Sequence, residues 1–236
     1  LDRVSAYLAA FQNVLKHQDF RLVYIDAFSG DGGVELRGEE LPLLEQGREF
    51  TEGSARRAIA LPQAFDRYHF IDASGPSLDK LKAFVGSEHP ALSERMNYHR
   101  GDVNVEIPKA IAQLDARKER AVVFADPFGM QLAWETIKVI GSKPVDFWYL
   151  APTMAINRVL TRDGQWPESW ASRLDRSLGT TDWRTGFYKS TIIGTLFGNE
   201  TKTEKVGGID EIEDFIHARL GTVFMMERNR LRLSDR

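Results

Sequence analysis

Four aspartates stand at the ends of short apolar runs, and they are the residues of this sequence best placed to do chemistry. They close or follow the segments LVYI, FDRYHFI, MNYHR and AVVFA, and they are Asp26, Asp72, Asp102 and Asp126. If these segments are parallel strands, their carboxyl ends meet at one edge of a sheet, where α/β folds bind their ligands. Carboxylates at that edge would attract a cation or accept hydrogen bonds from hydroxyl and amino groups.

Glycines crowd the turn after the first run, in RLVYIDAFSGDGG at residues 21–33. Gly30, Gly32 and Gly33 permit positive φ and carry no Cβ, so the backbone can turn tightly and approach a ligand closely. Their G-x-G-G spacing departs from the dinucleotide pattern G-x-G-x-x-G, and the preceding aspartate would repel a pyrophosphate. S-adenosylmethionine carries an ammonium and a sulfonium group, which that aspartate and the ring of Phe28 would attract. The turn therefore favours S-adenosylmethionine, and the alternative is a glycine-rich turn that binds nothing.

Three further residues complete the predicted cofactor site. Gly53-Ser54 opens a predicted helix at residues 55–61, with Ser54 as its N-cap and the positive helix end directed at the same crevice. Asp72 could accept hydrogen bonds from both ribose hydroxyls, or it could cap the next turn together with the serine and glycine that follow it. Asp102 could accept a hydrogen bond from the adenine amino group, or it could serve a turn of its own.

The segment Asp126-Pro127-Phe128-Gly129 is the predicted catalytic element. Proline after a strand forces an extended turn and removes an amide, so the carboxylate and nearby carbonyls can point into the crevice. Methylation of an exocyclic amine needs a polar acceptor that orients the nitrogen and stabilises its developing positive charge, and an aromatic ring that stacks on the base. Asp126, Pro127 and Phe128 fit these roles, although D-P-x-G is also an ordinary turn sequence.

The apolar patterns around these residues predict a doubly wound, mostly parallel sheet of the Rossmann-like α/β class with a helical C-terminal appendage. Expected strands lie at residues 22–25, 65–72, 96–100, 121–125 and 145–150, and expected helices at 2–18, 78–85, 107–114 and 134–140. We expect residues 1–150 to form the cofactor-binding core. Residues 34–52 are charged and weakly periodic, which indicates an inserted loop, and a mobile lid is one interpretation.

The pattern changes after residue 151. We expect residues 151–205 to form a helical or irregular cover, and residues 206–236 to complete the core with a helix at 209–220 and a strand at 222–226. The cover mixes cations with aromatics, which suits nucleic acid, although solvated arginines on a helical cover explain the pattern as well. The residues of this mixed segment at 158–188 are Arg158, Arg162, Arg173, Arg176 and Arg184 with Trp166, Trp170, Trp183, Phe187 and Tyr188.

Composition excludes several classes of function. The 236 residues include no Cys, which rules out disulfides and thiolate nucleophiles, and the five His show no metal-binding spacing, so no metal is expected. No apolar run approaches the ~20 residues that cross a bilayer, and no signal peptide is evident, so we expect a cytoplasmic protein without membrane contact. The net charge of −3 neither supports nor excludes nucleic acid.

In their order and spacing, these segments resemble class I S-adenosylmethionine-dependent methyltransferases and, more narrowly, the three-Cys-motif partner protein (TcmP) family. The similar segments are YIDAFSGDGG, GSARRAIAL, HFIDAS, GDVN, FADPFG with LAWETI, and VDFWYLAP with INRVL, within Val23–Leu160. The resemblance implies a methyltransferase-like fold, a cofactor crevice around Asp26, Asp72 and Asp102, and a three-Cys partner similar to radical-SAM proteins. DAFSGDGG is also similar to the first motif of DNA cytosine-C5 methyltransferases, but a chain without Cys lacks their nucleophile. FADPFG matches the D/N-P-P-Y/F signature of amino-methyltransferases only in part.

Two functions follow as hypotheses. The first is an S-adenosylmethionine-dependent methyltransferase of a nucleobase amino group or similar amine, which works with a three-Cys partner in phage or mobile-element DNA modification. The alternative is a catalytically silent methyltransferase-fold subunit that binds a partner protein or nucleic acid.

Overall fold

The computed structural model describes residues 1–34, 51–195 and 198–224, and the chain divides into two compact units. The first unit comprises residues 1–126 and 142–150, and the second comprises residues 127–141 and 151–236. The first unit contains α1 (Asp2–Leu15), β1 (Arg21–Asp26), β2 (Gly33–Val34), β3 (Thr51–Glu52), α2 (Ser54–Ile59), β4 (Arg67–Asp72), α3 (Gly75–Glu88), the 3₁₀ helix η1 (Pro90–Arg95), β5 (Met96–Arg100), α4 (Val103–Ala112), β6 (Glu119–Ala125) and β7 (Val145–Tyr149).

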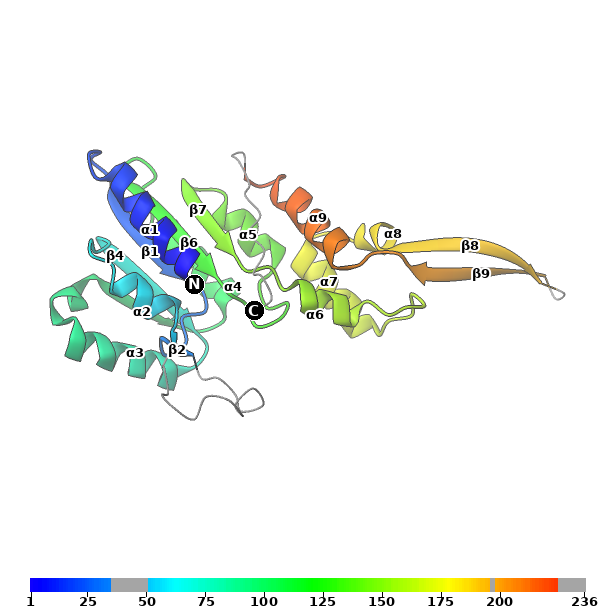
Figure 1. The fold of residues 1–236 in the computed structure, drawn as a ribbon, viewed down its shortest axis with the longest axis horizontal. Coiled ribbons are helices and arrows are strands. Elements are labelled where there is room, and N and C mark those ends of the chain that lie inside the picture. Colours follow the sequence, from blue (N-terminus) through cyan, green and yellow to red (C-terminus); the bar gives the residue numbers. More distant parts are fainter. Residues whose placement is uncertain (35–50, 196–197, 225–236) are drawn as a thin grey trace. The chain divides into compact units, whose positions relative to one another are not determined.

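The centre of the first unit is a five-stranded sheet in the order β5-β4-β1-β6-β7, with every pair parallel (Figure 1). The strand order therefore reverses between β1 and β6, as it does in doubly wound nucleotide-binding folds. The predicted Rossmann-like α/β class is confirmed. Each of the five predicted core strands is present, and the boundaries differ by at most two residues.

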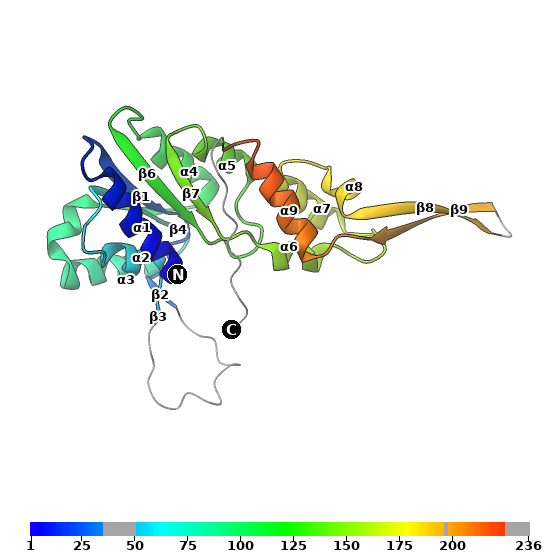
Figure 2. The same cartoon turned by 45° about the horizontal axis from the view of Figure 1, so that its top comes forward.

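The sheet is covered on both faces, and the alternation of side chains along each strand decides which residues face which layer. Helices α1, α2 and α3 share one apolar cluster with Tyr24 of β1 and with Tyr68 and Phe70 of β4. Helix α4 lies on the opposite face (Figure 2). Tyr24 and Asp26 are two residues apart on β1, so both side chains point toward the layer that contains α2.

The cluster beneath α1 and α2 contains several fully buried aromatic rings. Tyr24, Phe65, Tyr68 and Phe70 each have 0% exposure, and the rings of Tyr24 and Phe65 lie 5.6 Å apart. The hydroxyl of Tyr68 accepts a hydrogen bond from the Phe65 amide at 2.9 Å, so this buried polar atom is satisfied. The cluster fixes the strands whose ends carry the predicted site.

The second unit contains α5 (Trp134–Ile140), α6 (Thr153–Val159), α7 (Glu168–Leu178), α8 (Trp183–Gly186), β8 (Tyr188–Thr195), β9 (Gly198–Lys205) and α9 (Ile209–Leu220). Helix α7 is capped at its C-terminus by Gly179, whose φ of 66° is left-handed. A Cβ at Gly179 would lie 2.1 Å from the Trp134 ring, so the close approach of α5 and α7 depends on this glycine.

Two predictions for the C-terminal half are wrong. The segment 151–205 is not only helical or irregular, because β8 and β9 form a long antiparallel hairpin in which Lys189 pairs with Glu204. Residues 222 and 223 form a turn after α9 rather than the start of a strand, and the rest of the expected strand at 222–226, like the end of the 206–236 segment, lies outside the described residues. Within the described ranges, the central sheet takes no strand from beyond Tyr149. None of the helices described there is both long and apolar enough to cross a membrane.

Candidate active site at the carboxyl edge of the sheet

The carboxyl ends of β1, β4, β5 and β6 bring the predicted site residues of the first unit to one edge of the sheet. Strand β1 ends at Asp26, β4 ends at Asp72, and Asp126 directly follows β6. In the parallel register, Asp26 lies opposite Phe70 of β4 and Phe124 of β6. Ligands of doubly wound sheets bind at this edge, next to the point where the strand order reverses.

The glycine turn adopts the conformation that its residue types permit. Gly30 has φ of 56° and Gly32 has φ of 75°, in the left-handed region that favours glycine. A Cβ at Gly32 would lie 2.7 Å from Cγ of Arg56, whereas a Cβ at Gly30 would meet nothing closer than 4.0 Å. Gly32 therefore allows α2 to pack closely, and Gly30 leaves open space beside the turn. Gly33 begins β2 and pairs with Glu52 of β3.

Asp26 is fully buried beneath the turn. Its carboxylate accepts hydrogen bonds from the Tyr24 hydroxyl at 3.1 Å and from the Phe28 amide at 3.3 Å. The pKa of Asp26 is raised to about 6, chiefly by burial and in small part by the negative charge of Asp126. Hydrogen bonds from the Ser54 side chain, the Phe28 amide and the Tyr24 hydroxyl act in the opposite direction. Asp26 thus acts on the turn as a hydrogen-bond acceptor, and on a ligand only through its electric field.

Ser54 is not the N-cap that the sequence predicted. The N-cap of α2 is Gly53, whose amide donates a hydrogen bond to the Gly32 carbonyl at 2.7 Å, and Ser54 is the first helical residue. The Ser54 side chain hydrogen-bonds instead to Asp26. A Cβ at Gly53 would lie 3.0 Å from the Gly32 carbonyl oxygen, so a serine would be crowded at the cap position.

Asp72 joins the glycine turn to the next helix. Its Oδ2 accepts a hydrogen bond from the Gly30 amide at 2.9 Å, and its Oδ1 accepts one from the Ser74 amide at 2.7 Å. Ser74 is the N-cap of α3 and accepts from the Ser77 amide. The turn role considered for Asp72 is therefore present, and each carboxylate oxygen keeps a second lone pair for another donor.

Asp102 is the N-cap of α4, which begins four residues before the predicted start of that helix. Its Oδ1 accepts hydrogen bonds from the amide and the side chain of Asn104, both at 2.8 Å. The preceding residue, Gly101, donates its amide to the Asp72 carbonyl at 3.1 Å. Asp102 therefore lies close to Asp72 along the same edge of the sheet. It caps the turn into α4, which is the alternative role that the sequence left open.

The predicted catalytic segment spans the boundary of the two units. In the first unit, Asp126 is exposed, yet its partly desolvated carboxyl group has a raised pKa. In the second unit, Pro127 is buried and Phe128 is 90% exposed. Gly129 has φ of 73°, which confirms a turn after β6.

The aromatic residues of the segment at 158–188 mostly form the core of the second unit. The Trp166 ring lies 4.9 Å from the rings of Trp183 and Tyr188, and Trp183 has 0% exposure. Arg184 forms a two-pronged ion pair with Asp175 at 2.8 and 2.9 Å, and Asp175 also accepts from Trp183 Nε1 at 2.7 Å. Packing thus accounts for much of this pattern, and its binding to nucleic acid stays a prediction.

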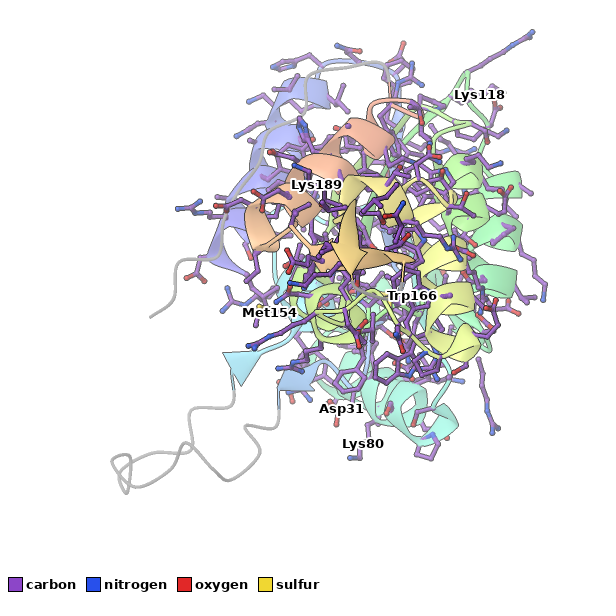
Figure 3. The ribbon with its side chains drawn as sticks, turned by 90° about the vertical axis from the view of Figure 1, so that its right-hand side faces the viewer. Asp31, Lys80, Lys118, Met154, Trp166 and Lys189 are labelled. Atoms are coloured by element: carbon purple, nitrogen blue, oxygen red, sulfur yellow. The ribbon has the colours of Figure 1, made fainter. Side chains whose placement is uncertain are left out.

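Some contributors to the site were missed in the sequence. Tyr24 supports the Asp26 carboxylate, and the spacing of two residues on a strand was the signal that could have revealed it. Asp31, between Gly30 and Gly32, forms an ion pair with Lys80 of α3, with 3.4 Å between Asp31 Oδ2 and Lys80 Nζ (Figure 3). No local pattern in the sequence indicates this contact. Most of the loop predicted at 34–52 lies outside the described residues.

Comparisons with known proteins add little to this geometry. The sequence matches no protein-family model and no curated protein. Similar solved structures include a Legionella pneumophila protein of the DUF519 family, at 14% identity over 92% of this chain and 89% of that chain with a TM-score of 0.43. The methyltransferase domain of bacterial CtHen1 is 15% identical over 86% of this chain and 98% of that chain, with a TM-score of 0.31. A candidate RNA methyltransferase from Pyrococcus horikoshii is 14% identical over 86% of this chain and 84% of that chain, with a TM-score of 0.35. At these values the assignment of fold rests on the strand order of this chain.

Proposed function

We propose that this protein is an S-adenosylmethionine-dependent methyltransferase that acts on an amino group, such as that of a nucleobase. The observation that carries the proposal is the pair of carboxyl groups, Asp26 and Asp126, at the ends of the adjacent parallel strands β1 and β6. They lie at the reversal of strand order, and the charge of Asp126 contributes to the raised pKa of Asp26. A cationic ligand beside them would relieve this repulsion.

The same carboxyl groups disfavour a dinucleotide. A pyrophosphate would need the free amides of a helix N-terminus after the glycine turn. Here one amide at the start of α2, that of Gly53, is bonded to the Gly32 carbonyl, and the Phe28 amide of the turn is bonded to Asp26, so these two amides are not free for a pyrophosphate. S-adenosylmethionine carries no phosphate, so it requires none of these amides.

The residues around the turn fit such a cofactor. Open space beside Gly30 lets the backbone approach a ligand, and the spare lone pairs of Asp72 suit the two ribose hydroxyls. Asp102, next to Asp72, would accept from the adenine amino group. The bound cofactor would supply an electrophilic methyl group.

Asp126 would serve the methyl acceptor. An exposed carboxylate at the end of β6 can accept a hydrogen bond from an amine and so orient the nitrogen lone pair. The amine becomes cationic as it is methylated, and a carboxylate placed there in advance stabilises that charge. The raised pKa of Asp126 also suits it to take up the proton that the product releases.

Methyl transfer from labelled S-adenosylmethionine to DNA, RNA, nucleosides and a three-Cys partner protein, assayed in parallel, tests the proposal. We expect transfer to one class of acceptor. Asp126→Ala should lower turnover by about 10²- to 10³-fold while cofactor affinity stays nearly unchanged, the usual scale for one lost preorganised polar contact. Asp79→Ala on the exposed face of α3 is the matched control.

The internal hydrogen bonds of Asp26 and Asp72 favour a second candidate, a methyltransferase-fold subunit without activity. Both carboxylates would make these bonds in a purely structural turn. This function would be preferred if no acceptor is methylated, and if Asp126→Ala lowers thermal stability and cofactor affinity together.

A further inference from the structure

The second unit has a shallow pocket of about 440 Å³, and one of its lining residues is Phe128 of the predicted catalytic segment. The turn after β6 forms one wall, and helices α6 and α7 form the other. Its lining includes Phe128, Gly129, Met130, Arg158, Val159 and Arg173. Apolar atoms and two cations therefore share one open surface.

Phe128 presents its ring to solvent. The side chain is 90% exposed, whereas its neighbour Pro127 is buried, so the chain is anchored immediately before the ring. The left-handed φ of 73° at Gly129 then turns the backbone away. Exposure of a complete phenyl ring is unfavourable in water, and a planar ligand that stacked on it would remove that ring from water.

The two arginines of the pocket are unengaged. Neither Arg158 of α6 nor Arg173 of α7 makes a hydrogen bond or ion pair with any residue in the described ranges, and both are exposed. Arg184 and Arg219 of the same unit differ, because Arg184 binds Asp175 and Arg219 donates to the Leu178 and Gly179 carbonyls. No carboxylate is among the lining residues that the structure describes. The pocket therefore carries uncompensated positive charge.

We infer that this pocket binds a single-stranded polynucleotide, with a base stacked on Phe128 and backbone phosphates on Arg158 and Arg173. Stacking requires a base whose face is free, which a duplex does not offer without strand opening. Arginine guanidinium groups bind phosphate through paired hydrogen bonds. An acidic peptide would use the arginines and leave the phenyl ring in water, so the ring favours the polynucleotide.

The inference rests on the proposed function in one respect only, namely that the bound strand would supply the amine that is methylated. Phe128 follows Asp126 with one residue between them in the chain. Binding of the strand by the pocket requires neither the cofactor nor methyl transfer, so the two can be tested separately.

Fluorescence anisotropy with labelled single-stranded DNA and RNA 12-mers, without cofactor, tests the inference. A matched duplex and a polyglutamate peptide serve as competitors. We expect single strands to bind more tightly than the duplex, and the DNA and RNA arms to show which sugar is preferred. Phe128→Ala should weaken binding about 5- to 150-fold, the measured range for loss of one stacked base. Phe128→Leu keeps an apolar side chain but loses the ring, so it should also weaken binding. Phe128→Trp keeps a ring that can stack, so its affinity should stay close to that of the wild type.

The arginines have a signature of their own. Arg158→Gln and Arg173→Gln should each weaken binding and reduce the slope of log affinity against log salt by about 0.7, the value for one phosphate contact on a single strand. Arg117→Gln, at an exposed turn of the first unit, is the matched control and should change neither. Circular dichroism of each variant shows that it is folded.

Three results would overturn the inference: no binding of either strand at low salt, equal affinity for the duplex or the acidic peptide, or variants that bind as the wild type does. Calorimetry with S-adenosylmethionine separates this inference from the proposed function. If the cofactor binds and no strand does, the inference alone fails. If strands bind and the cofactor does not, the proposed function alone fails.

Discussion

The backbone amide of Gly30 donates a hydrogen bond of 2.9 Å to the carboxylate of Asp72, which lies 42 residues further along the chain. This bond ties the turn after β1 to the end of the neighbouring strand β4. The other Asp72 oxygen binds the Ser74 amide at the start of α3. One carboxylate thus holds together the backbone that is proposed to receive the cofactor.

Loss of the Asp72 carboxylate should therefore affect both binding and folding. We expect Asp72→Ala to weaken binding of S-adenosylmethionine by about 1.5–3 kcal/mol, through the loss of charge-assisted hydrogen bonds to ribose. It should also lower the free energy of unfolding by about 1–3 kcal/mol, because the Gly30 and Ser74 amides lose their acceptor. Calorimetry and urea denaturation measure the two effects. A loss of stability with unchanged cofactor affinity would leave Asp72 with its turn role alone.

Asp26 should give the protein a pH-dependent stability of predictable sign. Its folded pKa of about 6 lies above the ordinary value of 3.8, so between these values the folded state holds more protons than the unfolded state. The contribution of Asp26 to stability is therefore greatest below pH 3.8 and falls as the pH rises through 6, by on the order of 3 kcal/mol. In Asp26→Asn this dependence should vanish. Denaturation of both proteins between pH 4 and pH 8 (about two units on either side of the titration) measures it, and identical pH profiles would contradict the assignment.

The two left-handed glycines of the turn should differ in their tolerance of a side chain. Gly30→Ala adds only the cost of a left-handed alanine, about 1–2 kcal/mol, because its Cβ meets open space. Gly32→Ala adds the same cost and also a Cβ that lies 2.7 Å from Arg56 Cγ. Thermal denaturation should therefore show a larger loss for Gly32→Ala. Cofactor affinity should fall in Gly30→Ala, since the new methyl group would occupy the space beside the turn.

In the second unit, Asp175 should be the polar residue on which stability depends most clearly. It accepts hydrogen bonds from Trp183 and from both prongs of Arg184, and although partial burial opposes them, these bonds lower the pKa of Asp175. We expect Asp175→Ala to cost about 1–3 kcal/mol, because the buried Trp183 Nε1 loses its partner. The stabilising effect of Asp175 should be lost as the pH falls below its ordinary pKa. Asp182→Ala, at the exposed start of α8, is the control, and equal losses in the two variants would refute the role.

The sequence predicted the parallel sheet because its strands are buried on both faces and read as continuous apolar runs such as AVVFA. The hairpin of β8 and β9 escaped prediction because β9 is polar throughout, and because the two isoleucines of β8, Ile192 and Ile193, are adjacent and do not give the apolar alternation of a half-buried strand.

In the site, the sequence identified the aspartates at the strand ends but could not show how they are used. Whether the Asp26 carboxylate points toward the turn or away from it depends on the packing of α2, which the local sequence does not show. Serine is a good N-cap by its local chemistry, so the sequence favoured Ser54 as the cap of α2. The structure places Gly53 there, because the cap position lies against the Gly32 carbonyl and leaves little room for a Cβ. The pocket of Phe128, Arg158 and Arg173 joins residues that lie far apart in the sequence, so only the folded chain brings them together.

The edge of the sheet around Gly30, Asp72 and Asp126 is proposed to receive a sulfonium cofactor. Isothermal titration calorimetry with S-adenosylmethionine, its demethylated product and NAD⁺ measures this binding. We predict that the first two ligands bind with dissociation constants below about 1 mM, a binding free energy more favourable than about −4 kcal/mol, and that NAD⁺ does not bind. Binding of NAD⁺, with no heat of binding from S-adenosylmethionine or its product, would contradict the proposed cofactor.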